Sequence, residues 1–319
     1  MNQAVQRILV VGGNGFIGSA ICKAALARGI QVTSVSSSGK PYQTAKGHTP
    51  YWASKVDWRK GDAFSPESFA HLFPEVGGVV HTLGTLIEGD QYKRAIKEGN
   101  IPETFGSFFQ SMLCSNGNPL EKGAEGVGKS SYESMNRDAA LRVCEAFVSC
   151  SLPNGTTRAL NAPRPFVYIS AEDIFRPIIS AKYIKTKREA EQGIENMMAN
   201  NSDYRGVYIR PSLVYHAHQR PLTTPAAVLL DLSAKLHSKI PPGLPSPSGI
   251  LRSLAPGSSL ESVANALTIP PIHVDHVAEA VCLTLSSSVN PVQGVVGVKR
   301  MRELIGWPVT SDYTQMAGV

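Results

Sequence analysis

The chain has 319 residues, of which 42% are hydrophobic and 18% are charged, a balance typical of a folded globular protein rather than a disordered one. No apolar run approaches the roughly 18 residues that a membrane-spanning helix needs. The net charge of +6 comes from scattered basic residues, without zinc-finger spacing or an RNA-binding aromatic signature. These features argue against a transmembrane segment and against nucleic-acid binding.

The five cysteines form neither a C-x-x-C pair nor a cluster with histidine. We therefore expect buried free thiols in a reducing compartment and no metal site. The N-terminus enters the first predicted strand almost at once, which leaves no room for a signal or transit peptide. By this reasoning the protein is cytoplasmic, or its presequence is missing from this chain, or its targeting signal is internal.

Short apolar runs alternate with helical patterns along much of the chain. The run at 7–11 ends in glycines and is followed by a helical pattern over 16–29. Strands follow at 30–36, 55–58, 77–83, 166–170 and 206–211, and most are separated by helices at 66–73, 132–150 and 187–198. Such alternation implies right-handed crossovers and a parallel sheet covered on both faces, so the sequence predicts a doubly wound α/β fold.

The first predicted strand is followed by GGNGFIG, which satisfies both G-x-G-x-x-G and G-x-x-G-x-x-G. The glycines permit a tight turn and a close approach of the backbone to a pyrophosphate, at which the following helix points its N-terminal dipole. This motif between a strand and a helix predicts a dinucleotide-binding Rossmann loop; the alternative is a tight turn that has lost its ligand. The predicted contact residues are Gly12, Gly13, Asn14, Gly15, Phe16, Ile17 and Gly18.

The end of the second predicted strand bears on the choice between NAD and NADP. An acidic residue there would hold the ribose 2′-hydroxyl of NAD, but the chain instead offers Ser36, Ser37, Ser38 and Lys40. Hydroxyls and an ammonium favour a 2′-phosphate, so NADP (NADPH) is preferred over NAD. Asp62, after the third strand, is predicted to hydrogen-bond the adenine amino group, with a helix cap as the alternative.

Two regions interrupt the alternation. Residues 85–131 are rich in Gly, Ser and Asn and too long for a plain connection, so we predict an insertion or a flap. Residues 212–270 carry many prolines and glycines and follow strands whose carboxyl ends border the ligand crevice of such a fold. The predicted organisation is a nucleotide-binding domain over 1–211 and a small C-terminal substrate cap within 212–319, interleaved with the last Rossmann elements.

The spacing Y-x-x-x-K places a phenol and an ammonium one helical turn apart on one face. It occurs at 42–46, at 51–55, and at Tyr183 with Lys187. The first two lie between the second and third strands, on the adenosine side of such a sheet, so we interpret their tyrosines as surface residues. The third follows the strand that ends at Ser170, which suits a catalytic pair; the alternative is that the pair merely begins a helix capped by Ser170.

Several motifs appear in the order of one large family. They are GGNGFIG, VVHTLG at 79–84, VYISA at 167–171, YIKTK at 183–187, IRPSLVY at 209–215 and IHVDHVAEAV at 272–281. Over 7 to about 285 the sequence therefore resembles an extended or atypical short-chain dehydrogenase/reductase. The stretches SVSSSGKP, HTLGTLIEGDQYK, NPLEK and YISAEDIF and the terminal ELIGW resemble the fungal mitochondrial subfamily linked to coenzyme Q biosynthesis. That subfamily is similar in turn to the dehydrogenase-like accessory subunit of respiratory complex I.

The resemblance implies roles for individual side chains. It makes Tyr183 the acid/base, Lys187 its activator and ribose ligand, Ser170 the carbonyl-polarising hydroxyl, and Asn136 a member of a proton relay. A neighbouring ammonium and a nicotinamide cation favour the phenolate, and a serine hydroxyl can donate to an oxygen on which negative charge develops. Further cofactor contacts are predicted at the ends of two strands, at His81, Leu83, Gly84, Arg210 and Pro211. For His81 the alternative is a partly buried histidine whose hydrogen bonds are satisfied within the protein.

The segment before Tyr183 is apolar, with Phe175, Pro177, Ile178 and Ile179, which suits a hydrophobic ring better than a nucleotide sugar. Together with the resemblance, this segment predicts an NADP(H)-dependent oxidoreductase that acts on a quinone-like lipid, and the resemblance implies a coenzyme Q biosynthetic complex as its partner. The alternatives are a non-catalytic cofactor-binding subunit of a mitochondrial complex and a sugar-nucleotide epimerase or reductase. A mitochondrial location, on the matrix side of the inner membrane, follows from the resemblance alone.

Overall fold

The structure is a computed structural model, and it describes residues 7–44, 46–86, 131–150, 163–174, 176, 178–199, 201–220, 223–241, 244–286 and 290–307. Most of the predicted insertion at 85–131 lies outside the described residues. So do Phe175 and Pro177 of the apolar segment before Tyr183, and Cys114.

A seven-stranded sheet forms the centre, with strand order β3-β2-β1-β4-β5-β6-β9 and parallel pairing throughout. The strands are β1 (Arg7–Val11), β2 (Gln31–Ser36), β3 (Asp57–Lys60), β4 (Gly78–His81), β5 (Arg164–Ile169), β6 (Tyr204–Arg210) and β9 (Gly294–Gly297). The chain order reverses between β1 and β4, and doubly wound sheets bind ligands beyond the carboxyl ends of the strands at such a switch point. The predicted fold class is confirmed.

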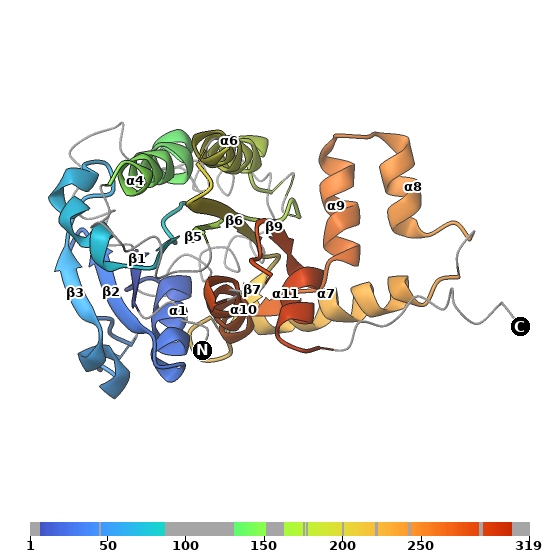
Figure 1. The fold of residues 1–319 in the computed structure, drawn as a ribbon. Coiled ribbons are helices and arrows are strands. Elements are labelled where there is room, and N and C mark those ends of the chain that lie inside the picture. Colours follow the sequence, from blue (N-terminus) through green and yellow to red (C-terminus); the bar gives the residue numbers. More distant parts are fainter. Residues whose placement is uncertain are drawn as a thin grey trace, which may run out of the picture.

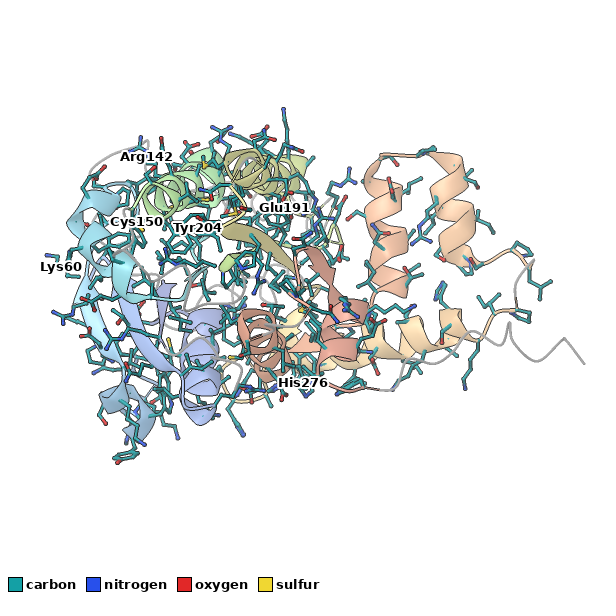
Figure 2. The ribbon with its side chains drawn as sticks, viewed as in Figure 1. Lys60, Arg142, Cys150, Glu191, Tyr204 and His276 are labelled. Carbon is teal, nitrogen blue, oxygen red and sulfur yellow. The ribbon has the colours of Figure 1, made fainter. Side chains whose placement is uncertain are left out.

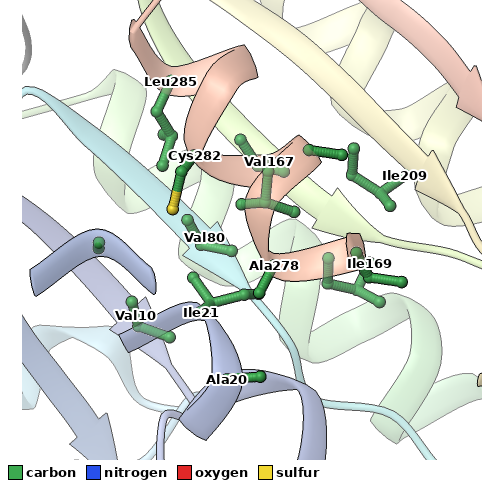
Figure 3. Packing of buried hydrophobic residues seen from close by; sticks show 14 of the residues in the cluster. Val10, Ala20, Ile21, Val80, Val167, Ile169, Ile209, Ala278, Cys282 and Leu285 are labelled. Carbon is green, nitrogen blue, oxygen red and sulfur yellow. The ribbon is translucent and has the colours of Figure 1, made fainter. Parts of the chain in front are cut away.

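Helices cover both faces of the sheet (Figure 1). On one face lie α1 (Phe16–Ala27) and α10 (Val274–Ser286), and on the other lie α4 (Ala139–Val148) and α6 (Ala181–Met198). Figure 3 shows Ile21 of α1 and Ala278 of α10 against Val80 and Val167 of the sheet. Burying a valine or isoleucine side chain stabilises the fold by about 1.5–3 kcal/mol.

The position of β1 inside the sheet explains why its sequence is continuously apolar. Side chains along a strand point alternately to opposite faces. Ile8 and Val10 join the core cluster beneath α1 and α10, whereas Leu9 and Val11 join the cluster beneath α4 and α6. Because both faces are buried, neither set of positions tolerates polar side chains, and the strand carries no hydrophobic alternation.

Three elements differ from the sequence-based prediction. The helix expected at 66–73 is two 3-10 segments, η2 (Pro66–Ser68) and η3 (Ala70–Glu75), because Phe69 leaves the helical conformation at φ −138°. The strand expected at 55–58 begins later, since a 3-10 turn, η1 (Tyr51–Lys55), precedes it. The helix expected at 132–150 begins as a π-helix, η4 (Glu133–Asp138), before it continues as α4.

An arm of three helices extends beyond the edge of the sheet (Figure 1). It consists of α7 (Thr223–Ser238), α8 (Pro247–Leu254) and α9 (Ser259–Thr268). At its base β7 (Val214–Tyr215) pairs with β8 (Ile272–His273), and the chain then returns to the main sheet through α10, β9 and α11 (Val298–Leu304). The arm lies within the predicted cap, but its part in substrate binding stays a prediction. No helix in the described ranges is both long and apolar enough to cross a membrane.

The described cysteines are free thiols, buried at Cys22, Cys144 and Cys282 and half-buried at Cys150. Burial raises the pKa of Cys144 and of Cys282 to about 12, so these thiols are not ionised at neutral pH. Within the described part of the chain, no group of histidine, cysteine and acidic side chains is placed to hold a metal ion.

Candidate functional site

The glycine loop after β1 has contacts that only glycine permits. A Cβ atom on Gly18 would lie 2.2 Å from the Gly12 carbonyl oxygen, and one on Gly13 would lie 2.3 Å from Ser34 Oγ. Gly12 itself has φ +88°, in the left-handed region that favours glycine. The N–H of Gly15 donates to the Gly12 carbonyl at 3.0 Å and closes the turn. The loop therefore presents bare backbone to the carboxyl edge of the sheet, as binding of a pyrophosphate requires.

Helix α1 begins directly at this loop. Gly15 is its N-cap residue, and within the described residues no side chain accepts a hydrogen bond from its first turn. The amides of that turn are thus available to an anion, and the helix dipole favours negative charge there. Asn14 Nδ2 donates to Ser38 Oγ at 3.3 Å and ties the loop to the end of β2. The predicted cradle residues fit a dinucleotide phosphate.

The residues predicted to select NADP divide into two kinds. Ser36 Oγ accepts from the Gly39 N–H at 3.1 Å, and Ser38 Oγ accepts from the Lys40 N–H at 3.2 Å, so these hydroxyls shape the turn after β2. The side chains of Ser37 and Lys40 are exposed at its rim. The preference for NADP stays a prediction, and Ser37 and Lys40 are the side chains free to meet a 2′-phosphate.

Asp62 takes part in the turn after β3. Its Oδ1 accepts from the Phe64 N–H at 3.0 Å, and its own N–H donates to Ser68 Oγ at 3.2 Å. These bonds order the turn before the 3-10 segments, but the N-cap residues of those segments are Ser65 and Phe69, so the alternative role of Asp62 as a helix cap is wrong. The predicted adenine contact stays a prediction.

The interpretation of Tyr42 as a surface residue is wrong. Its ring is 8% exposed and stacks on Trp52 with ring centroids 5.5 Å apart, and its hydroxyl accepts from Gln219 Nε2 at 3.0 Å. Gln219 lies 177 positions away, so local sequence carries no sign of this contact. Tyr51, by contrast, is 81% exposed, as expected.

Lys187 of α6, Asn136 of η4 and Gly84 after β4 meet at the carboxyl edge of the sheet. A Cβ atom on Gly84 would lie 2.7 Å from Lys187 Nζ and 2.9 Å from Asn136 Oδ1. Lys187 Nζ donates to the Ile169 carbonyl at 2.9 Å and lies 4.7 Å from the centre of the Tyr168 ring. The structure thus brings together three of the residues predicted for catalysis and cofactor binding.

The ammonium of Lys187 is buried, at 4% exposure. Burial lowers its pKa to about 7; Glu191 acts in the opposite direction, and the positive charge of Arg188 adds to the lowering. Near neutral pH the side chain is therefore divided between its charged and neutral forms. Such a lowered pKa is typical of functional lysines.

Asn136 owes its position to the π-helix. Its Oδ1 accepts from the Thr85 N–H at 2.9 Å, and its Nδ2 donates to the Thr85 carbonyl at 3.1 Å. The wider π turn leaves its main-chain carbonyl to accept a hydrogen bond from the Tyr168 hydroxyl. Asn136 therefore fixes the loop after β4, which carries Gly84.

Tyr183 lies on α6 one turn before Lys187. It is 8% exposed, and its ring centroid is 6.0 Å from that of Tyr132. Burial raises the pKa of Tyr183 above its usual value; Tyr132 adds to this, and Arg188 opposes it. The phenol is thus protonated at neutral pH and can donate a proton. The cap of α6 is Ser180, whose Oγ accepts from the Lys182 N–H at 3.2 Å, so Ser170 is not the cap.

Ser170 lies in a buried ionic network around Glu191, which sits between α6 and the sheet (Figure 2). The Ser170 hydroxyl donates to Glu191 Oε1 and accepts from Arg188 Nη1, the latter at 3.0 Å. Arg210 donates to the same carboxylate through Nε at 3.0 Å and through Nη2. In the described contacts Ser170 and Tyr183 are not hydrogen-bonded to each other, and the proposed roles of Ser170 and Arg210 at the nicotinamide stay predictions.

The remaining predicted contacts lie close to the same edge. His81 is fully buried beside Phe166 and Tyr168, and neither of its ring nitrogens has a hydrogen-bond partner in the described structure. Burial lowers its pKa to about 3, and Lys187 adds to this, so the ring is neutral. Leu83 packs against Gly12, with Cδ2 2.8 Å from a Cβ placed there. Pro211 is buried, and its carbonyl accepts from the Glu172 N–H at 2.8 Å.

Sequence reasoning missed two charged residues at this site. Glu191 follows Lys187 by one turn on α6, and a carboxylate on the buried face of a helix was a signal that could have found it. The guanidinium of Arg220 lies 3.9 Å from the centre of the Phe16 ring at the start of α1. Its position depends on a distant turn, and nothing in the local pattern marks it.

The fold and the glycine loop together define a Rossmann protein of the dinucleotide-binding class. The model of the NAD dependent epimerase/dehydratase family matches residues 8–97. The chain is 34% identical over 222 residues to MIOREX complex component 2 of Saccharomyces cerevisiae, a match that covers 68% of this chain and 76% of that protein. The chain belongs to the NAD-dependent epimerase/dehydratase family within the short-chain dehydrogenases/reductases. The predicted resemblance is confirmed at this level.

A further curated protein and a solved structure are also similar to this chain. A 2-alkyl-3-oxoalkanoate reductase of Stenotrophomonas maltophilia is 26% identical over 211 residues, covering 66% of this chain and 51% of that protein. The structure of UDP-glucuronic acid 4-epimerase from Bacillus cereus in complex with NAD superposes with a TM-score of 0.51 over 92% of this chain and 76% of that one. At 18% identity this second likeness concerns the fold alone.

Proposed function

We propose that this protein binds NADP(H) and transfers a hydride between the cofactor and an apolar, quinone-like carbonyl substrate in mitochondrial coenzyme Q biosynthesis. The observation that carries the proposal is the meeting of Lys187, Asn136 and Gly84 at the carboxyl edge of the sheet, with Tyr183 one turn away. The glycine loop borders the same edge, since Leu83 next to Gly84 packs against Gly12. A cofactor in the cradle therefore reaches this group.

The nicotinamide supplies the hydride chemistry when it is bound. Tyr183, protonated at neutral pH, donates a proton to the substrate oxygen during reduction and accepts one during oxidation. Lys187 in its charged form stabilises the phenolate that remains and hydrogen-bonds the cofactor ribose. Asn136 holds the loop after β4 in place and stands next to Lys187 for proton relay. Ser170 polarises the carbonyl once its hydroxyl turns from Glu191.

Two observations support an apolar carbonyl substrate. Ile179, just before α6, is buried in a cluster with Tyr132, Tyr183 and Leu213, so an apolar wall adjoins the predicted acid/base. The similar protein from Stenotrophomonas maltophilia is named as a reductase of an alkyl-bearing oxo acid. The exposed hydroxyl of Ser37 and the ammonium of Lys40 support NADP as the cofactor.

A second candidate function is that of a cofactor-binding subunit without turnover. It is favoured by the engagement of the Ser170 hydroxyl with Glu191 and by the name of the yeast relative, which describes a component of a complex. Bound dinucleotide would then stabilise the folded chain by linkage. The proposed mitochondrial location rests on the resemblance to the subfamily linked to coenzyme Q biosynthesis. A sugar-nucleotide epimerase remains the third candidate, supported by the family model.

Replacement Tyr183→Phe separates the first two functions, because it removes the proton donor and preserves the ring. We expect NADPH affinity within about twofold of the unchanged chain, and turnover of a short-chain quinone reduced by at least about a hundredfold, as the loss of a general acid implies. The measurement is NADPH oxidation followed by absorbance, with affinity from calorimetric titration.

Tyr51→Phe is the matched control, since Tyr51 is exposed and belongs to another Y-x-x-x-K pair. Equal turnover in both variants and the unchanged chain would contradict catalysis by Tyr183. Absence of turnover in all three, with cofactor binding retained, would favour the subunit. Thermal stabilisation by nucleotide sugars, and not by quinones, would favour the epimerase.

A further inference from the structure

The turn at 216–220 lies against the start of α1 and is held at both ends. The Arg220 N–H donates to the His216 carbonyl at 2.8 Å, and the Arg220 carbonyl accepts from the Thr223 N–H and Oγ1 at 3.0 and 2.6 Å. Beside it, Gln219 Nε2 donates to the Tyr42 hydroxyl at 3.0 Å. The turn thus connects the base of the arm to the adenosine side of the site and fixes the backbone of Arg220.

Arg220 is half-buried, and its guanidinium lies against an aromatic ring with no counter-charge among the described residues. The Cζ atom of Arg220 lies 3.9 Å from the centre of the Phe16 ring. Its Nε is buried and has no hydrogen-bond partner in the described structure. No carboxylate of the described residues forms an ion pair with it. Burial lowers its pKa to about 10, which still leaves it charged at neutral pH. A half-buried cation with an unpartnered Nε is placed to pair with an anion from outside the chain.

The position of Arg220 identifies that anion. Phe16 is the first residue of α1, where the unpaired amides of the first turn and the bare backbone of the glycine loop favour a phosphate. Ser37 and Lys40, which would meet a 2′-phosphate, lie instead at the end of β2. Arginine presents a planar fork that binds phosphate oxygens through paired hydrogen bonds, and a ring beneath it keeps that fork oriented.

We propose that Arg220 binds the pyrophosphate of the dinucleotide from the side opposite the glycine loop, with Phe16 as the platform for its guanidinium. This inference rests on the proposed binding of NADP(H). It adds a cationic side chain that binds the cofactor from a turn about 200 residues after the glycine loop. The hydrogen bond between Gln219 and Tyr42 holds the turn in place. Arg220 is a binding residue and takes no part in proton or hydride transfer.

Calorimetric titration of the full chain with NADPH and NADH tests the proposal through Arg220→Gln and Arg220→Lys. We expect the Gln variant to lose about tenfold to a hundredfold in affinity for both cofactors alike, because a charge-assisted hydrogen bond to the shared pyrophosphate is removed. The Lys variant, which keeps the charge without the fork, should lose less. The control is Arg252→Gln on α8, whose side chain is exposed and remote from the loop, and it should bind as the unchanged chain does.

The melting temperature without ligand separates ligand binding from a structural role. Arg220→Gln removes a half-buried cation that has no counter-charge among the described residues, so the unliganded variant should melt at the same temperature or higher, while the rise caused by NADPH shrinks. A lower melting temperature together with unchanged affinity would overturn the proposal and leave Arg220 as a packing residue. A loss confined to NADPH would also overturn it, by placing the side chain at the 2′-phosphate.

The two proposals fail in different ways. If the unchanged chain binds neither NADPH nor NADH, the proposed function is wrong and the role of Arg220 falls with it. If the unchanged chain binds both cofactors and Arg220→Gln binds them equally well, only the role of Arg220 is wrong. The Lys variant keeps this comparison available if the Gln variant does not fold.

Discussion

At the scale of the residue, burial makes Lys187 a titrating group near neutral pH. Its pKa is about 7 in the folded chain and returns to its ordinary value near 10.5 on unfolding. Between these values the unfolded chain holds more protons, so the stability conferred by Lys187 rises with pH, whereas below about 7 both states are protonated and the cost of burying the charge is fully present.

Lys187→Met should therefore remove the pH dependence that Lys187 gives to the free energy of unfolding. The difference in free energy of unfolding between the unchanged chain and the variant is expected to grow in favour of the unchanged chain from about pH 7 to pH 9, by at most about 1.4 kcal/mol for each pH unit. Urea unfolding at several pH values measures it. Lys185→Met is the control, because the Lys185 ammonium is exposed on the same helix. If the free energy of unfolding depended on pH in the same way in both variants, the buried Lys187 would not be the cause.

At the scale of the element, the π-helix η4 holds the loop after β4 through one side chain. Asn136→Ala removes two hydrogen bonds to the backbone of Thr85 from a fully buried position. We expect a loss of about 1–3 kcal/mol in the free energy of unfolding, and weaker cofactor binding because Gly84 is no longer fixed.

The matched change is Asn196→Ala, on the exposed face of α6, which should stay within about 0.5 kcal/mol of the unchanged chain. Chemical denaturation of the two variants measures the difference. Equal stability would mean that the loop keeps its shape without Asn136, and the positioning role would be wrong.

Local pattern predicted most of the elements but not their irregularities. The strand at 7–11, the glycine loop and the helix after it follow from hydrophobic period and glycine placement, which are properties of neighbouring residues. The π turn at η4 and the 3-10 segments before β4 were missed. The π turn is accompanied by a tertiary contact, the bond from Tyr168 to the Asn136 carbonyl, that a window of sequence does not contain.

At the scale of the whole molecule, the sequence was sufficient for the doubly wound sheet and for the family, and insufficient for the side-chain contacts that join distant segments at the site. Arg210 binds Glu191, Gln219 binds Tyr42, and Arg220 stacks on Phe16. Each of these pairs joins segments that only the folded topology places side by side. Motif order predicted Tyr183, Lys187 and Asn136 as a group, and the structure places Lys187 and Asn136 together beside Gly84.

The central claim is that this chain holds NADP(H) in the glycine loop, and the direct measurement is a calorimetric titration with NADPH and NADH on the unchanged chain and on Ser37→Asp. Ser37 is exposed at the end of β2, so a carboxylate there repels a 2′-phosphate without disturbing the core. We expect NADPH to bind more tightly than NADH, and we expect the variant to lose about tenfold in NADPH affinity while its NADH affinity stays the same. Failure of the unchanged chain to bind any dinucleotide would contradict the account.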